Sequence, residues 1–194
     1  MNILDLLSKE ERMKATRISF RKREILFQEG DLCKGVYVIE KGSIKIASFT
    51  LEGHEVVYNA LGEGKMFGNN LAFSDEPYFR GSVIGDTGGM LSFFEKKSLL
   101  SLLQSNEAFL QEYLRIQSEF GKSLNAKIKL LSFASAEERF DFFLTLHKGV
   151  VSYSSVSALA DSLFLKRETL SRLIHTLERK GKILIENKSI KAVY

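Results

Sequence analysis

The sequence predicts an α+β fold: an N-terminal antiparallel β-barrel or jelly roll, one long helix and a C-terminal winged helix-turn-helix. Three observations support this prediction. Segments rich in Ile, Val, Phe and Tyr alternate with glycine-containing turns over roughly the first hundred residues. Glycine then becomes rare between 96 and 131, where apolar residues recur at helical spacing. Near the C-terminus, two shorter helical patterns precede a short hairpin pattern.

Composition narrows the class of protein. A chain of 194 residues with 44% hydrophobic content can bury a core in one or two domains. The net charge of +4 and the pI near 9.1 favour a polyanionic partner. The single cysteine, Cys33, excludes a disulfide framework or a cysteine-only metal site within one chain. Without an apolar run of about twenty residues or a signal-peptide pattern, we expect a cytoplasmic protein with no membrane contact.

The first domain is predicted over residues 1–104. Leucines and charged residues alternate at helical spacing in 2–16, so we expect a short helix there. Strands are then expected at 25–27, 36–40, 43–49, 56–61, 82–85 and 90–94. Their spacing and the turns between them are typical of an antiparallel barrel or jelly roll.

A long helix is predicted over 105–132, with two apolar stripes. One stripe follows heptad spacing and contains Leu114, Gln117, Gly121, Leu124, Ile128 and Leu131. The other contains Phe109, Tyr113, Ile116 and Phe120. We expect the second stripe to pack on the barrel and the first on a partner helix, which predicts a homodimer. The alternative is a helix buried within one monomer.

The third domain is predicted over 133–194. Ser135 followed by Glu138 is a capping-box pattern that opens a helix at 136–148, and a short strand is expected at 149–153. Two apolar runs at helical spacing follow: Val156, Leu159, Ala160 and Leu163, then Leu170, Leu173, Ile174 and Leu177. The three residues between the runs match the turn of a helix-turn-helix. The last segments, 182–185 and 189–193, are typical of a wing hairpin.

The second helix of this unit opens with side chains suited to DNA: Lys166, Arg167, Glu168, Thr169, Ser171 and Arg172. Arginine can donate two hydrogen bonds to guanine, glutamate can accept one from cytosine, and hydroxyl groups suit phosphate oxygens. A recognition helix presents such residues to the major groove of DNA. The alternative is an amphipathic helix pair with a solvated basic face.

This stretch, with Leu159-Ala160 and Gly181-Lys182-Ile183, resembles the recognition unit of the Crp/Fnr family of transcription regulators. The resemblance implies double-stranded DNA with an inverted repeat as the partner. It also implies that Arg167, Glu168 and Arg172 contact a TGTGA- or TTGAT-like half-site. RNA polymerase would be a further partner of an activator. The family usually has Gly where this chain has Phe164 and a Ser cap where it has Lys166. Since Phe is costly in a left-handed conformation, we expect the turn to be built differently.

Upstream, segments 27–31, 37–42, 61–64 and 66–68 look like the glycine framework of the family's cyclic-nucleotide-binding barrel. The resemblance covers nearly the whole chain. It implies an effector pocket, for which the matching residues are Phe67, Gly68, Asn69, Asn70, Arg80 and Ser82.

The residues of this pocket depart from those of nucleotide-binding members. Asn69 stands where the family's ribose-binding Glu would be, and Gly81 stands at the phosphate-binding Arg. Arg80 comes one residue early, which in a strand turns a side chain to the opposite face unless the preceding loop shifts. Losing a charge-assisted phosphate contact costs about 2 kcal/mol or more. We therefore expect cyclic AMP not to be the effector, which leaves another small molecule or a vestigial pocket. The cofactor is unknown.

Three other classes of function fit the sequence less well. The histidines His54, His147 and His175 are scattered and form no catalytic constellation, so we expect no enzyme. A haem or redox sensor that uses Cys33 is an alternative regulator. A barrel that binds only a protein partner would leave the charged start of the second C-terminal helix unexplained.

Overall fold

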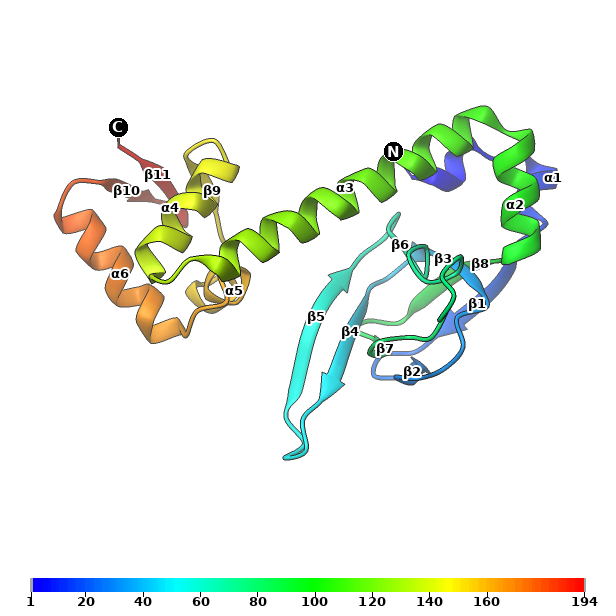
Figure 1. The fold of residues 1–194 in the computed structure, drawn as a ribbon, viewed down its shortest axis with the longest axis horizontal. Helices are drawn as coiled ribbons and strands as arrows, with labels where there is room; N and C mark the ends of the chain where they lie inside the picture. The colour runs from blue at the N-terminus through cyan, green and yellow to red at the C-terminus, as the bar shows by residue number, and fades with distance from the viewer. Residues whose placement is uncertain (1, 194) are drawn as a thin grey trace. The chain divides into compact units, whose positions relative to one another are not determined.

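The computed structural model describes residues 2–193, and the chain splits into two compact units between Glu119 and Phe120 (Figure 1). Helix α3 (Glu107–Ser132) contributes residues to both units. The three-part division at 104/105 and 132/133 stays a prediction. Within residues 2–193, no helix combines the length and the apolar character needed to cross a membrane.

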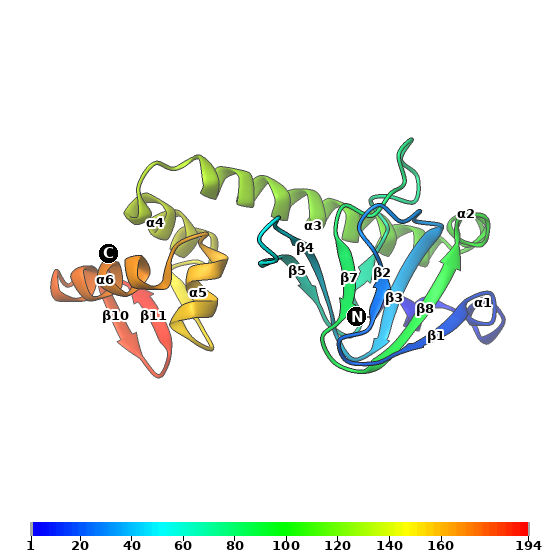
Figure 2. The ribbon, with the colours of Figure 1, turned by 90° about the horizontal axis from the view of Figure 1, so that it is seen from below.

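The N-terminal unit contains two four-stranded antiparallel sheets (Figure 2). The strands are β1 (Thr16–Phe20), β2 (Ile25–Phe27), β3 (Gly35–Lys41), β4 (Ile44–Phe49), β5 (Glu55–Leu61), β6 (Met66–Phe67), β7 (Ser82–Gly85) and β8 (Gly89–Glu95). One sheet has the order β1-β8-β3-β6 and the other the order β2-β7-β4-β5. Eight strands in two facing sheets are a jelly-roll arrangement, so the predicted fold class is confirmed for this unit.

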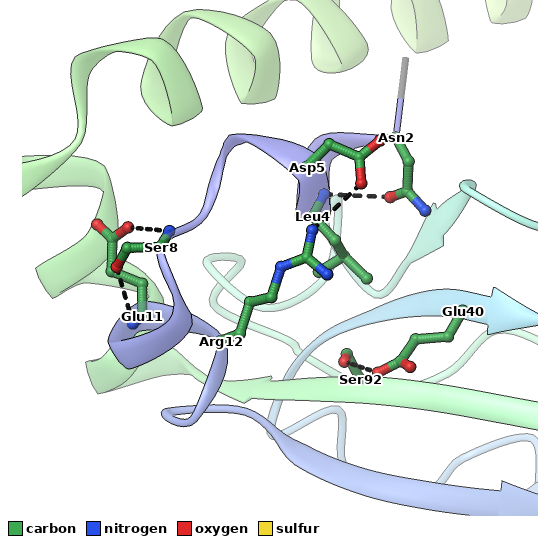
Figure 3. Close-up of polar contacts among 8 residues, drawn as sticks. All are labelled: Asn2, Leu4, Asp5, Ser8, Glu11, Arg12, Glu40 and Ser92. Carbon is green, nitrogen blue, oxygen red and sulfur yellow. Dashed lines mark hydrogen bonds and ion pairs between the residues drawn. The ribbon is translucent and has the colours of Figure 1, made fainter.

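The N-terminal segment differs from the single helix predicted at 2–16. It forms a 3-10 turn, η1 (Ile3–Leu6), a short helix, α1 (Lys9–Arg12), and then β1. Ser8 separates the first two, because its Oγ accepts a hydrogen bond from the Glu11 N–H at 3.2 Å while its own N–H donates to the Glu11 carboxylate at 2.8 Å (Figure 3). This capping box starts a new helix at the point where a continuous one was expected.

The helical region predicted from 96 onward is divided at Asn106. Helix α2 (Lys96–Ser105) ends there, and the Asn106 Oδ1 accepts a hydrogen bond from the Phe109 N–H at 3.0 Å, which caps α3. Phe109 and Tyr113 of α3 are buried in a core with residues from the N-terminal segment, β3, β8 and α2. One stripe of α3 therefore packs on its own barrel, as predicted.

The C-terminal unit is a winged helix-turn-helix, which confirms the predicted fold class for this part (Figure 1). Its elements after α3 are α4 (Ala136–Leu146), β9 (Val150–Ser152), α5 (Val156–Ser162), α6 (Arg167–Arg179), β10 (Ile183–Glu186) and β11 (Ser189–Ala192). The three strands form one antiparallel sheet with the order β10-β11-β9. The predicted capping box at Ser135 and Glu138 is present and opens α4.

Candidate nucleic-acid interface

Helix α6 is fixed by one apolar face and leaves the opposite face free. Leu170, Ile174 and Leu177 are buried at helical spacing and pack into the core of the C-terminal unit. The side chains on the opposite face are exposed and follow the spacing of four, three and four residues: Glu168, Arg172, His175 and Arg179. The burial of one face thus decides which residues of α6 remain available to a partner.

The structure places the six predicted DNA-binding residues at the N-terminal end of α6. Lys166 is the N-cap, and its side chain makes no capping hydrogen bond, as expected from the loss of the family's Ser. Arg167, Glu168 and Thr169 form the exposed first turn. Arg172 is exposed in the next turn, beside the half-buried Ser171. The free N–H groups and the positive dipole of a helix N-terminus also favour phosphate at this end.

His175 and Arg179 were not among the predicted DNA-binding residues, although they share the exposed face with Glu168 and Arg172. The sequence signal that would have found them is their position seven and eleven residues after Glu168, which returns to the same side of a helix. They extend the polar face of α6 by about two turns beyond its first residues.

The turn between α5 and α6 keeps a left-handed residue in spite of its sequence. Phe164 has φ +53°, its N–H donates to the Asp161 carbonyl at 3.1 Å, and the Leu165 N–H donates to the Ala160 carbonyl at 3.0 Å. This is a Schellman motif, in which glycine usually takes the position of Phe164. The expectation of a differently built turn is therefore wrong. The chain retains the geometry and accepts a backbone cost of about 1–2 kcal/mol.

The wing hairpin closes with a two-residue turn. Asn187 (φ +47°) and Lys188 (φ +60°) lie between the paired residues Glu186 and Ser189. Positive φ at both central residues matches the type I′ turn that suits the twist of a hairpin. Lys188 is exposed at the tip of the wing, where a phosphate contact and a solvated lysine are both compatible with its position.

The space between the two sheets of the N-terminal unit holds a cluster of aromatic rings. Its members are Phe27, Tyr37, Phe67, Phe79 and Phe93. Ring centroids lie 4.8 Å apart for Phe27 and Phe79, 4.9 Å for Tyr37 and Phe67, and 4.8 Å for Tyr37 and Phe93. Phe67, a predicted pocket residue, is thus packed against other rings in the core.

Asn69 is buried and bound to α3. Its Nδ2 donates to Oε1 of Gln117 at 2.7 Å, and its carbonyl accepts from the Gln117 Nε2 at 3.0 Å and the Tyr113 hydroxyl at 3.3 Å. Burial raises the pKa of Tyr113, which keeps its hydroxyl a donor. The preceding Gly68 has φ +79°, and a Cβ there would lie 2.7 Å from the Gly35 carbonyl oxygen. Glycine is therefore required to bring the backbone to this position.

The other predicted pocket residues point elsewhere. Asn70 is exposed. Arg80 is exposed too, and its Nη2 lies 2.8 Å from the Glu76 carboxylate. The buried Ser82 accepts a hydrogen bond from the Glu29 N–H at 3.1 Å. Asn70 and Arg80 are thus exposed, whereas Phe67, Asn69 and Ser82 are buried and already contact other residues of the chain.

The heptad stripe of α3 is largely exposed. Its four large apolar members are between 43% and 65% exposed: Leu114, Leu124, Ile128 and Leu131. Among the described residues, no heavy atom outside the local backbone lies within 4 Å of where a Cβ of Gly121 would stand. Gln117 differs from the rest, since its side chain binds Asn69. An apolar row of this kind on a charged helix is typical of a surface that a partner covers.

Cys33 lies in the core and has the chemistry of a buried thiol. It is 3% exposed, and its Sγ donates to the Gly35 carbonyl at 3.2 Å. Burial raises its pKa, so the reactive thiolate is scarcer at neutral pH than for a free cysteine. We expect the native thiol to react with Ellman's reagent about tenfold or more slowly than the thiol of the urea-unfolded chain. Equal rates would contradict this and favour a redox role.

Comparisons with known proteins match this arrangement. The family model of the cyclic nucleotide-binding domain matches residues 17–106. The cyclic AMP receptor protein of Thermus thermophilus is 24% identical over 163 residues, covering 80% of this chain and 74% of that protein. The anaerobic regulatory protein of Bacillus subtilis is 24% identical over 196 residues, covering 89% of this chain and 77% of that protein.

Solved structures support the fold. The catabolite activator protein of Thermus thermophilus has a TM-score of 0.59 at 21% identity, with 100% of this chain and 94% of that chain covered. A variant of CooA from Carboxydothermus hydrogenoformans has a TM-score of 0.71 at 14% identity, with 99% of this chain and 90% of that chain covered. Both the barrel and the winged helix-turn-helix lie within these matches. The chain thus carries a cyclic nucleotide-binding domain and is similar, over most of its length, to transcription regulators of the Crp/Fnr family, which bind DNA, typically as dimers.

Proposed function

We propose that this regulator is a homodimer that recognises an inverted repeat with one α6 from each subunit. The observation that carries the proposal is the N-terminal end of α6, where the polar side chains are exposed and the helix axis is held by buried leucine and isoleucine side chains. Rigid support of this kind is what a recognition helix needs in the major groove.

The side chains of α6 divide into two roles. Arg167, Glu168 and Arg172 would contact base edges of a TGTGA- or TTGAT-like half-site, where each good pair contributes about 1–3 kcal/mol of discrimination. Lys166, Thr169 and Ser171 would contact mainly the phosphate backbone, which fixes position without specifying sequence. For an activator, RNA polymerase would be a further partner.

Dimerisation supplies the symmetry that an inverted repeat requires. The exposed apolar members of the heptad stripe would be buried against the same stripe of a second copy, a self-complementary contact about a two-fold axis. Two recognition helices related in this way bind half-sites about 34 Å apart, one turn of the double helix.

A binding measurement with three duplexes tests this function. A labelled inverted repeat, the same duplex with one half-site reversed, and a scrambled duplex are titrated with the purified protein at several salt concentrations. We expect the inverted repeat to bind most tightly and all three to weaken as salt rises, because phosphate contacts release counterions. Equal affinity for the repeat and the scrambled duplex would refute sequence-specific recognition.

In this proposal, DNA binding is controlled by an effector other than cyclic AMP. The arginine nearest to the family's phosphate position, Arg80, is exposed and paired with Glu76, and Asn69 already has hydrogen-bond partners on α3. A cyclic nucleotide bound by these two residues would have to displace both contacts. Its phosphate would then lack the charged partner that makes such bonds strong.

A second candidate is a regulator that needs no effector. The observation that favours it is the link from Asn69 to Gln117, since the cassette is joined to α3 by side chains of the chain itself. Phe67, one of the residues that the resemblance assigns to a ligand pocket, is packed against other aromatic rings. The free protein would then already be competent to bind DNA.

Isothermal titration calorimetry with cyclic AMP tests whether this nucleotide is the effector, against the two candidates of another effector or none. We expect no binding at micromolar concentrations, because no Lys or Arg among residues 2–193 is buried in the core, where it could pair with the phosphate. Titration with cyclic GMP serves as the control for a general nucleotide effect. Micromolar affinity for cyclic AMP would overturn the assignment of the pocket.

A further inference from the structure

Arg139 of α4 connects two segments that determine how α6 is presented. Its Nε donates to the Phe133 carbonyl at 3.2 Å, and its Nη1 donates to the Phe164 carbonyl at 3.2 Å. Phe133 follows the last residue of α3, whereas Phe164 is the left-handed residue of the turn before α6. One planar guanidinium thus binds two backbone carbonyls from segments separated by 31 residues of sequence.

We propose that Arg139 is a positioning residue for DNA recognition, which holds the Phe164 turn in its left-handed conformation and so fixes the N-terminal end of α6. The proposal rests on the function proposed above for α6. Arg139 itself belongs to α4, outside the set of residues assigned to DNA contact.

The turn needs such a support because of its residue type. Phenylalanine disfavours positive φ, and the following cap residue, Lys166, adds no side-chain hydrogen bond to the first turn of α6. The Phe164 ring is itself half exposed, so core packing does little to hold it. A charge-assisted bond to the carbonyl of this residue offsets the strain where it arises.

A turn that loses this support would spend part of its time in other conformations. Only the fraction of molecules with the correct turn presents Arg167 and Glu168 in register with the groove, and the apparent DNA affinity is the intrinsic affinity multiplied by that fraction. The other bond, to the Phe133 carbonyl, joins the same guanidinium to the segment between α3 and α4. Arg139 therefore links the segment before α4 to the turn before α6 through hydrogen bonds.

Three variants test the proposal in the full-length protein. R139A should weaken binding to the inverted-repeat duplex by about tenfold, because a bond from a charged donor is lost in each subunit. R139K should lose nearly as much, since an ammonium group lacks the planar fork that reaches both carbonyls. R139A combined with F164G should recover most of the affinity, because glycine adopts positive φ without strain.

A matched control separates positioning from general stability. Ile190 is fully buried in the core of the same unit, and I190V lowers stability without touching the turn. In the R139A background, F164G should raise the DNA affinity. In the I190V background, F164G should change the DNA affinity only as much as it does in the wild type. Equal effects of F164G in both backgrounds would overturn the proposal.

A second readout does not depend on DNA. Amide hydrogen exchange of the Leu165 N–H, which closes the Schellman motif, should become about tenfold faster in R139A and return toward the wild-type rate in the double variant. The Ile174 N–H of α6 serves as the internal control. Unchanged exchange at Leu165 would refute the role of Arg139. Failure of the wild type to bind any specific duplex would instead refute the function proposed for α6.

Discussion

Replacing Leu124 with glutamate is expected to convert the proposed dimer into a monomer and to weaken binding to an inverted repeat by about 100-fold or more. Leu124 lies in the middle of the exposed apolar stripe of α3. Two-fold symmetry would bring two such carboxylates into one apolar seam, where each loses hydration and repels the other. The two leucines would also forfeit about 1.5–3 kcal/mol each of buried apolar surface.

Light scattering measures the oligomeric state, and fluorescence anisotropy of a labelled duplex measures the DNA affinity. The matched control is Leu100→Glu, since Leu100 of α2 is 42% exposed, close to the 43% of Leu124, but lies outside the stripe. The control variant should remain a dimer with normal affinity. A dimeric L124E protein would show that the stripe is not the subunit interface.

Replacing Arg172 with alanine is expected to remove most of the discrimination between the specific duplex and a scrambled one. Arg172 is exposed in the second turn of α6 on the face opposite to the core. Losing a bidentate contact to guanine costs about 1–3 kcal/mol per half-site, and a dimer loses it twice. The specific affinity should therefore fall by about 30-fold to about 20,000-fold, while binding to scrambled DNA falls by much less.

Lys166→Ala is the matched comparison for Arg172→Ala. Both changes remove one exposed positive charge from the same end of α6. Since Lys166 is assigned to phosphate, its loss should weaken binding to every duplex by a similar factor and reduce the salt dependence by about one phosphate contact per subunit. Similar effects of the two variants on the specificity ratio would contradict the separate roles.

Local signals in the sequence account for the parts of the fold that were predicted. The strands and the helix-turn-helix are marked by periodicity and turn residues, and the capping box at Ser135 and Glu138 is confirmed because it involves only neighbouring residues. The same pattern occurs at Ser8 and Glu11, where it opens α1. The sequence therefore contains the local signal that divides residues 2–16 into two short helical segments.

Other features depend on contacts that periodicity does not contain. Strand β6 has two residues and exists because it pairs with β3. Gln117 fits the heptad stripe by spacing, whereas its amide binds Asn69, 48 residues earlier in the chain. The turn at Phe164 keeps a left-handed residue although phenylalanine disfavours positive φ, and Arg139, 25 residues earlier in the chain, donates a hydrogen bond to its carbonyl. Each of these features involves a contact between residues that are distant in the sequence.

The most direct test is selection from a randomised duplex pool with the purified protein and no added ligand. We expect enrichment of an inverted repeat with TGA-containing half-sites about one helical turn apart, and we expect the Arg172→Ala protein to lose this enrichment. A pool that stays random, or one enriched in a motif without two-fold symmetry, would contradict recognition by paired α6 helices in the ligand-free protein.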